Sequence, residues 1–330
     1  MQSKHTTHRR DILRGGAALA ATTLLPSLLA AQTTSWPKQI KIVVPFPPGG
    51  SNDIFARLIA QKLGPGLGAT IVVENKGGAG GTIGASQVAR SNPDGATLLL
   101  TSSTFTGSAA VMNQLPYDAV KSFTPIAMLA RGPMLIATGN GTPYNSLPDL
   151  ISAAKKDPGK LAYGTAGVGS INHLATELLA TSAKVEMTHV PYKGIAGAVT
   201  DMIGGRLDLA ILSFPSAIGH VRGGKIRALA VTSKDASPFA KDLAPVAATV
   251  AGYEVDLWWG LFAPAGVAQA MTEQLNTLLK SIITDAVMTE RFAREGAVPA
   301  PISSAEFATI VAADLERWRR IAKERGIKAE

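Results

Sequence analysis

The chain of 330 residues contains no cysteine. This absence excludes disulfide bonds, thiolate-bound metals and a cysteine nucleophile, and it is typical of an exported protein that folds without oxidation. The patterns G-x-S-x-G and H-E-x-x-H are also missing, although they would be expected in many serine hydrolases and zinc peptidases. No motif therefore predicts catalysis, a metal or a cofactor.

Charged residues are scarce as well. They make up 17% of the chain against 46% hydrophobic residues, a balance that predicts a globular protein with a substantial core. The net charge is +8, of which the first 31 residues supply +3, and no basic patch interleaved with aromatic side chains occurs. Nucleic acid is therefore not an expected partner.

Residues 1–31 are typical of an export signal. A basic segment at 9–14 contains paired arginines and precedes an uncharged, Ala- and Leu-rich run at 15–31, which is short for a membrane span. The arginine pair favours a twin-arginine signal, with a general secretory signal as the alternative. We expect cleavage near Ala30 or Ala31 and a periplasmic mature protein.

The mature chain opens with a strand, a glycine turn and a helix. Residues 40–44 form an Ile/Val-rich run, Pro-Pro-Gly-Gly at 47–50 predicts a tight turn, and Ser51 is the expected helix N-cap. Asp53 would lie in the first turn, where the helix dipole favours it. Such a unit can bind an anion through free backbone N–H groups, or it can be an ordinary strand-to-helix connection.

The same device returns later in the chain. A strand at 161–163, a glycine turn at 164–169 and Ser170 as an N-cap precede a second helix, and neither a phosphate loop nor a dinucleotide fingerprint fits. A further strand at 96–100 ends in the hydroxyl cluster 101–104, at the sheet edge where ligands bind in α/β proteins, although helix capping is an alternative role. Two such units predict two lobes that face each other across a ligand.

The other expected elements are less distinctive. Two apolar runs lie at 123–130 and 134–138. A strand is expected at 205–215 and a helix at 272–284. A last helix at 303–325 should begin with a capping box, and its basic residues are interpreted as a solvated face.

Motifs throughout the mature chain carry a resemblance to a known family. They lie at 42–50 with Asp53, 73–81, 92–95, 163–170, 190–194, 204–208, 224–232 and 259–264. On these motifs, which keep the family's order, the sequence resembles the Bug family of extracytoplasmic solute receptors of tripartite tricarboxylate transporters.

The resemblance implies an α/β fold of the type II periplasmic-binding-protein kind, with two α/β lobes joined by crossing strands around a central ligand cleft. Lobe 1 would comprise residues 32–138 and 252–330, and lobe 2 residues 139–251. The protein would capture a small organic carboxylate and deliver it to the membrane subunits of the transporter. It would be a monomer, would need no cofactor and would catalyse no reaction.

Members of the family hold a ligand carboxylate with backbone and hydroxyl groups of two facing loops, here 46–53 and 165–170. Many of them carry an acidic or amide residue about where Ser213 lies, so an amino acid would lose a partner here. The ligand contacts implied by the resemblance are Phe46, Pro48, Gly49, Gly50, Ser51, Asp53, Gly81, Thr82, Ser102, Ser103, Thr104, Thr165, Ala166, Gly167, Gly169, Ser170, Tyr192, Ser213 and Phe214.

Two alternatives remain at this point. A sensor subunit of a membrane signalling system would have the same fold and pocket. A periplasmic hydrolase would need a nucleophile beside a base, and after the signal only His173, His189 and His220 could supply an imidazole. For His173 and His189 a structural role is favoured, because one follows a helix cap and the other precedes a strand.

Overall fold

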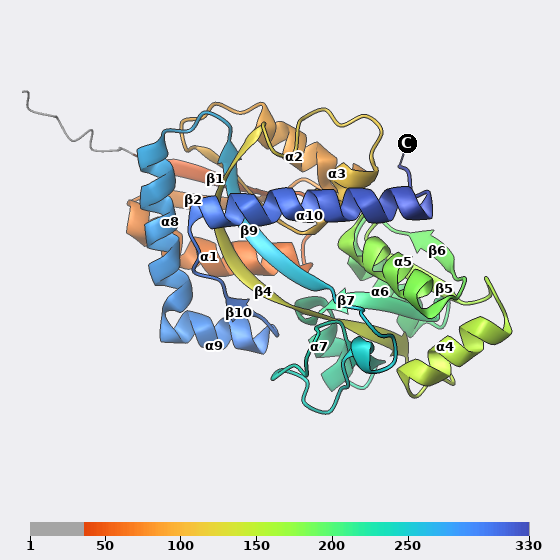
Figure 1. Ribbon diagram of the computed structural model, residues 1–330. Helices are drawn as coiled ribbons and strands as arrows, with labels where there is room; N and C mark the ends of the chain where they lie inside the picture. The colour runs from red at the N-terminus through yellow and green to blue at the C-terminus, as the bar shows by residue number, and fades with distance from the viewer. Residues whose placement is uncertain (1–35, 330) are drawn as a thin grey trace, which may run out of the picture. The chain divides into compact units, whose positions relative to one another are not determined.

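The computed structural model describes residues 36–329 (Figure 1). The predicted twin-arginine-like signal at 1–31, with its cleavage site near Ala30 or Ala31, lies outside these residues. Within the described part, no helix combines the length and the apolarity that crossing a bilayer requires.

A mixed sheet forms the centre of the described residues, in the order β2-β1-β3-β9-β4-β7-β5-β6, with β8 and β10 also paired to β4. Its strands are β1 (Gln39–Val44), β2 (Thr70–Asn75), β3 (Thr97–Ser102), β4 (Phe123–Gly139), β5 (Ala162–Thr165), β6 (Thr188–Pro191), β7 (Leu209–Ser213), β8 (Ile226–Val231), β9 (Asp256–Pro264) and β10 (Val298–Pro299).

The strands fall into two parallel groups. β1 is parallel to β2 and β3, and β5 is parallel to β6 and β7. The antiparallel strands β9 and β4 connect the groups, since β9 pairs with β3 and β4 while β4 also pairs with β7. Within each group the carboxyl ends of the strands lie at one edge, as the repeated strand-turn-helix device predicts.

β4 corrects one prediction. The apolar runs at 123–130 and 134–138 belong to a single continuous strand of 17 residues. Its first part pairs with β9 from Phe123 to Pro133, and its second part pairs with β7 and β8 from Met134 onward. Arg131-Gly132-Pro133 looks like a break because glycine and proline weaken strands, yet neighbouring strands keep this segment extended.

The helices are α1 (Ser51–Leu67), α2 (Thr82–Ala89), α3 (Thr104–Val111), α4 (Leu147–Lys156), α5 (Ile171–Ala183), α6 (Ile195–Ile203), α7 (Phe214–Arg222), α8 (Gln269–Thr284), α9 (Ala286–Arg294) and α10 (Ser304–Arg325). Short 3-10 turns occupy Ala79–Gly81 and Val246–Ala248. The expected strand at 205–215 is shorter than predicted, because Pro215 occupies the first turn of α7, a position that proline favours.

The last helix confirms its predicted start. Ser303 and Glu306 form the capping box of α10. In Figure 1 this helix (dark blue) runs past α3 toward α5, and it packs against both and against β4. Trp318 is buried, whereas Arg319 and Arg320 are exposed, which agrees with the interpretation of a solvated basic face.

Candidate functional site

A cavity of about 380 Å³ lies where several helices begin. Its lining includes residues from the first turns, or from the positions just before them, of α1, α3, α5, α6 and α7. The first N–H groups of a helix have no partner within the helix, and its dipole is positive at that end. The cavity is therefore surrounded by groups that favour negative charge.

Charged side chains contribute little to this cavity. Among the described residues that line it, Lys193 is the only charged one, and no aspartate or glutamate is present. Part of the wall is apolar and includes Met134, Ile171 and Leu257. The arrangement suits a small anion with an apolar portion.

The turn between β1 and α1 corrects a second prediction. The N-cap of α1 is Gly50, which has no side chain to cap the helix, and Ser51 is already helical. The nearby acceptor is Asp53, whose carboxylate Oδ2 accepts the N–H of Gly49 at 3.1 Å. Gly49 has φ +84°, a left-handed conformation that glycine adopts at little cost.

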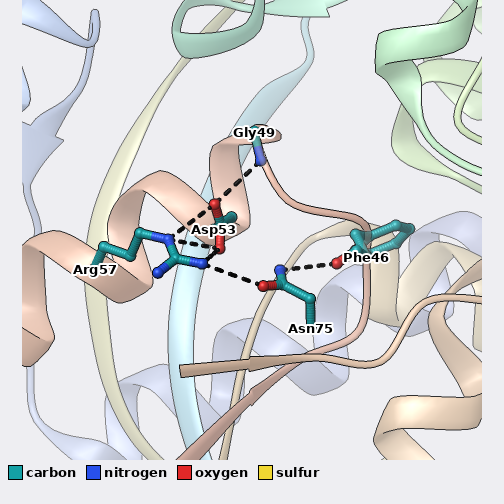
Figure 2. Close-up of polar contacts among 5 residues, drawn as sticks. All are labelled: Phe46, Gly49, Asp53, Arg57 and Asn75. Carbon is teal, nitrogen blue, oxygen red and sulfur yellow. Dashed lines mark hydrogen bonds and ion pairs between the residues drawn. The ribbon is translucent and has the colours of Figure 1, made fainter. Parts of the chain in front are cut away.

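Side chains from α1 and β2 hold this turn at both ends (Figure 2). The Arg57 guanidinium donates through Nε to both oxygens of Asp53 at 3.0 and 3.1 Å, and it also donates to Oδ1 of Asn75 at 3.4 Å. Nδ2 of Asn75 in turn donates to the carbonyl oxygen of Phe46 at 3.0 Å. Burial alone would raise the pKa of Asp53, but the hydrogen bonds from Arg57 and Gly49 outweigh it and hold that pKa below its ordinary value.

The turn between β5 and α5 is held differently. Ser170 is the N-cap of α5, as predicted, and its Oγ accepts the N–H of His173 at 3.4 Å while donating to the carbonyl oxygen of Gly167 at 2.7 Å. Oγ1 of Thr165 accepts the N–H of Gly167 at 3.2 Å and lies 2.7 Å from Nε2 of His189. The N–H of Gly169 donates to Nδ1 of His173 at 3.2 Å.

Two stacked histidines lie beneath this second turn. The rings of His173 and His189 are 3.9 Å apart and nearly parallel, with Tyr163 stacked on His189 at 5.0 Å. Burial lowers the pKa of both imidazoles, that of His189 to about 4. Both are therefore neutral near pH 7 and serve the turn through hydrogen bonds, in keeping with the structural role favoured from the sequence.

Close backbone packing connects the second turn to α3. Oγ1 of Thr104 accepts the N–H of Ile171 at 3.3 Å. A Cβ on Gly107 would lie 2.6 Å from the carbonyl oxygen of Gly169, so this approach requires glycine at that position. The starts of α3 and α5, which follow strands of different groups, are thereby brought to the same cavity.

The structure brings many of the predicted ligand contacts together. Those that line the cavity are Phe46, Pro48, Gly50, Ser51, Ser102, Thr104, Ala166, Tyr192 and Ser213. Those that do not line it are Gly49, Asp53, Gly81, Thr82, Ser103, Thr165, Gly167, Gly169, Ser170 and Phe214.

The second set has identifiable positions. Gly49 and Asp53 are hydrogen-bonded to each other in the turn before α1. Most of the residues from the turn before α5 support the backbone of that turn. Ser103 is fully buried. Thr82, which follows Gly81 at the start of α2, lines a separate surface hollow. Phe214 is buried in the first turn of α7 and contacts Phe239.

Sequence reasoning missed several lining residues. Pro47 and Asn52 lie within the expected loop 46–53 but were not among the individual contacts. The others are Met134, Ile171, Asn172, Lys193, Gly194, Ile195, Ala196, Gly197, Ser216 and Leu257. The turn before α6 had a readable signal, because a strand followed by Lys-Gly and an apolar run resembles the two devices already recognised. Met134 and Leu257 had none, since their place depends on the pairing of β4 with β9.

A family model described as a tripartite tricarboxylate transporter family receptor matches residues 55–327. The chain belongs to this receptor family. The family consists of solute-binding receptors, and the predicted Bug-family membership is confirmed.

Curated relatives of this receptor match over nearly their whole length. A protein from the tcbD-tcbE intergenic region of Pseudomonas sp. strain P51 is 35% identical over 324 residues, which cover 97% of this chain and 96% of that protein. Protein BugT of Bordetella pertussis is 35% identical over 300 residues, which cover 88% of this chain and 90% of BugT.

Solved structures of similar proteins agree with the fold. The periplasmic binding protein BugD matches with a TM-score of 0.84 at 33% identity, covering 89% of this receptor and 100% of that chain. The R. palustris protein Rpa4515 with adipate matches with a TM-score of 0.86 at 36% identity, covering 89% and 99%. MatC from Rhodopseudomonas palustris, with bound malate, matches with a TM-score of 0.79 at 30% identity, covering 86% and 98%. The predicted α/β periplasmic-binding-protein fold is confirmed.

Proposed function

We propose that this receptor works in the periplasm, where it captures a small organic carboxylate and delivers it to the membrane subunits of a tripartite tricarboxylate transporter. The single observation that carries the proposal is the cavity at which α1, α3, α5, α6 and α7 begin. Within residues 36–329, its lining contains one lysine and no acid. The adipate bound by Rpa4515 and the malate bound by MatC support the same chemical class.

The carboxylate would be held by backbone N–H and hydroxyl groups. Ser51 and Thr104 line the cavity beside the starts of α1 and α3, and each charge-assisted hydrogen bond to a ligand anion contributes about 1.5–3 kcal/mol. The ligand's carbon chain would contact the apolar wall at Met134 and Leu257. Among the predicted ligand contacts that do not line the cavity, those in segments 46–53 and 165–170 would act by shaping the two turns.

An amino acid is not the expected ligand. A carboxylate is the strongest partner for an ammonium group, and among the described residues none lines the cavity. Ser213, where the resemblance implies an acid or an amide in many family members, donates through Oγ to Oγ of Ser216 at 2.9 Å. We therefore expect acids without an ammonium group to be preferred.

Binding would involve closure of two lobes, one comprising residues 32–138 and 252–330 and the other residues 139–251. The partners of β4 change between Pro133 and Met134. Residues 134–138, placed in the first lobe, therefore pair with strands of the second, and β4 is a strand that crosses between the proposed lobes. Closure excludes water from the anion and strengthens its hydrogen bonds.

Thermal unfolding of refolded, ligand-free protein against a panel of mono- and dicarboxylates tests the proposal. An acid at a hundred times its Kd should raise Tm by about 5 °C or more. A panel that includes adipate, malate, citrate and aromatic acids and produces no shift would contradict the proposed function. Native mass spectrometry of protein purified from its host would identify the physiological acid.

A further inference from the structure

Asp53 lies in the first turn of α1, next to cavity-lining residues, yet it does not line the cavity itself. The residue is 5% exposed. Figure 2 shows its carboxylate between the guanidinium of Arg57 and the N–H of Gly49. An acid beside a site for anions requires an explanation, because it would repel a bound carboxylate.

We propose that Asp53, Arg57 and Asn75 form a positioning clamp for the turn 46–50, in which Arg57 neutralises Asp53 and no member of the clamp contacts the ligand. The inference rests on the proposed function and deepens it. It assigns the only acid in the first turn of α1 to the scaffold, so the site recognises acids that carry no ammonium group.

The turn depends on these side chains for its shape. Pro47 and Pro48 have no N–H to donate, and within the described residues the hydrogen bonds of segment 46–49 run to Asp53 and Asn75. Asp53 fixes the N–H of Gly49, and Asn75 fixes the carbonyl of Phe46. Arg57 connects the two anchors, since it donates to both of them.

The charge of Arg57 matters as much as its hydrogen bonds. Its η-nitrogen lies 2.9 Å from Oδ1 of Asp53. With this partner, the carboxylate leaves the positive end of the α1 dipole available to a ligand anion. Without it, an unneutralised charge would lie in the same helical turn as Ser51 and would oppose the ligand.

Variants of the clamp separate positioning from direct contact. Asp53→Asn removes the charge but keeps an acceptor for the N–H of Gly49, so adipate affinity should remain within about threefold of the wild type. Asp53→Ala removes the acceptor and should weaken adipate binding at least tenfold. Arg57→Gln keeps the carboxylate charged and should also weaken binding at least tenfold, with a larger loss at low ionic strength because the repulsion is unscreened.

Isothermal titration of these proteins with adipate and 2-aminoadipate measures the pattern, and malate with aspartate provides a second pair. Asn75→Ala is the alternative to Asp53→Ala if the latter does not fold, and it should also lose at least tenfold because it releases Phe46. Arg294→Gln breaks an exposed ion pair with Glu290 on α9 and is the matched control that should change nothing.

The outcomes are distinct. The clamp is overturned if Asp53→Asn loses as much affinity for adipate as Asp53→Ala. It is also overturned if 2-aminoadipate binds the wild type more tightly than adipate does and loses this advantage in Asp53→Asn, because Asp53 would then contact the ammonium group of the ligand. The clamp is also overturned if the wild-type chain binds an acid and every clamp variant binds that acid with the same affinity. If no acid binds the wild-type chain, the proposed function fails instead.

Discussion

The turns before α1 and α5 place helix starts at the same cavity, but they are built from different chemistry. Charged side chains hold the first, with Arg57 reaching Asp53 from the partly exposed surface of α1. Neutral, largely buried groups hold the second, through Ser170 and the stacked pair His173 and His189. Backbone N–H groups can therefore be fixed either by an ion pair or by packing.

The surroundings of two glycines show the same contrast. Both Gly49 and Gly169 have positive φ angles, +84° and +76°. A Cβ on Gly49 would meet nothing within 4 Å, whereas one on Gly169 would lie 2.3 Å from Cγ2 of Val111 on α3. The first turn is open on this side, and the second is packed against a neighbouring helix.

The largest effect is expected from alanine at these glycines. Gly169→Ala combines backbone strain with overpacking and should cost about 3–4 kcal/mol of unfolding free energy, whereas Gly49→Ala should cost only about 1–2 kcal/mol for its left-handed conformation. Urea unfolding of both variants measures the difference. Equal losses would show that the second turn is no more tightly packed than the first.

Acidification should weaken the second turn before the first. The pKa of His189 falls from 6.5 to about 4 on folding, so the unfolded chain binds more protons between these values. Stability is then lost as pH falls from about 6.5 to 4, by on the order of 2–3 kcal/mol. The lowered pKa of Asp53 places its own loss below about pH 4.

His189→Gln isolates this contribution. The amide can still donate to Oγ1 of Thr165, but it does not titrate. Comparing the unfolding free energies of the variant and the wild type at each pH removes the effect of groups such as Asp314, whose burial raises its pKa and acts in the opposite direction. A difference between the two proteins that does not change from pH 6.5 to 4 would contradict the prediction.

The serines of the two turns should show opposite effects. Ser170→Ala removes the N-cap of α5 and should cost about 1–2 kcal/mol of stability. Ser51 does not cap α1 but lines the cavity, so Ser51→Ala should leave stability within about 0.5 kcal/mol and weaken ligand binding about tenfold. Denaturant unfolding and calorimetric titration distinguish the two. If Ser51→Ala lost as much stability as Ser170→Ala, the two serines would have the same structural role, and the prediction would be wrong.

The smallest effect is expected at Lys193, which lies in the turn before α6. This turn contacts both the turn before α1 and the turn before α5. The N–H of Tyr192 donates to the carbonyl oxygen of Thr165 at 3.1 Å, and a Cβ on Gly194 would lie 3.2 Å from Pro47. Lys193→Gln should weaken acid binding about two- to fivefold, less at high salt, because an exposed charge contributes about 0.5–1 kcal/mol. Arg320→Ala on the exposed face of α10 is the control, and an equal loss there would remove Lys193 from the site.

Local signals predicted much of this fold. The capping box at Ser303 and Glu306, the cap at Ser170 and both strand-turn-helix devices depend on neighbouring residues, and the structure confirms them. The single strand β4 and the helices α3, α6, α7 and α9 were missed. Gly132-Pro133 imitates a break unless the partner strands are known, and α9 buries only Met288 and Phe292 behind its cap at Asp285.

The site was harder to predict than the fold. The sequence places Ser51 and Asp53 in one helical turn, but not the reach of Arg57 and Asn75 toward them, which depends on how α1 packs beside β2. Residues of both turns named from the resemblance line the cavity. Which residues of a turn line the cavity and which support it from behind is decided by tertiary packing.

The length of β4 has a consequence for dissecting the protein. One backbone segment supplies hydrogen-bond partners to β9 on one side of its midpoint and to β7 and β8 on the other. A fragment comprising residues 140–251 would therefore carry two bare strand edges, which invite pairing between molecules. This fragment is expected to self-associate, so residues 140–251 cannot be prepared as an independently folded domain.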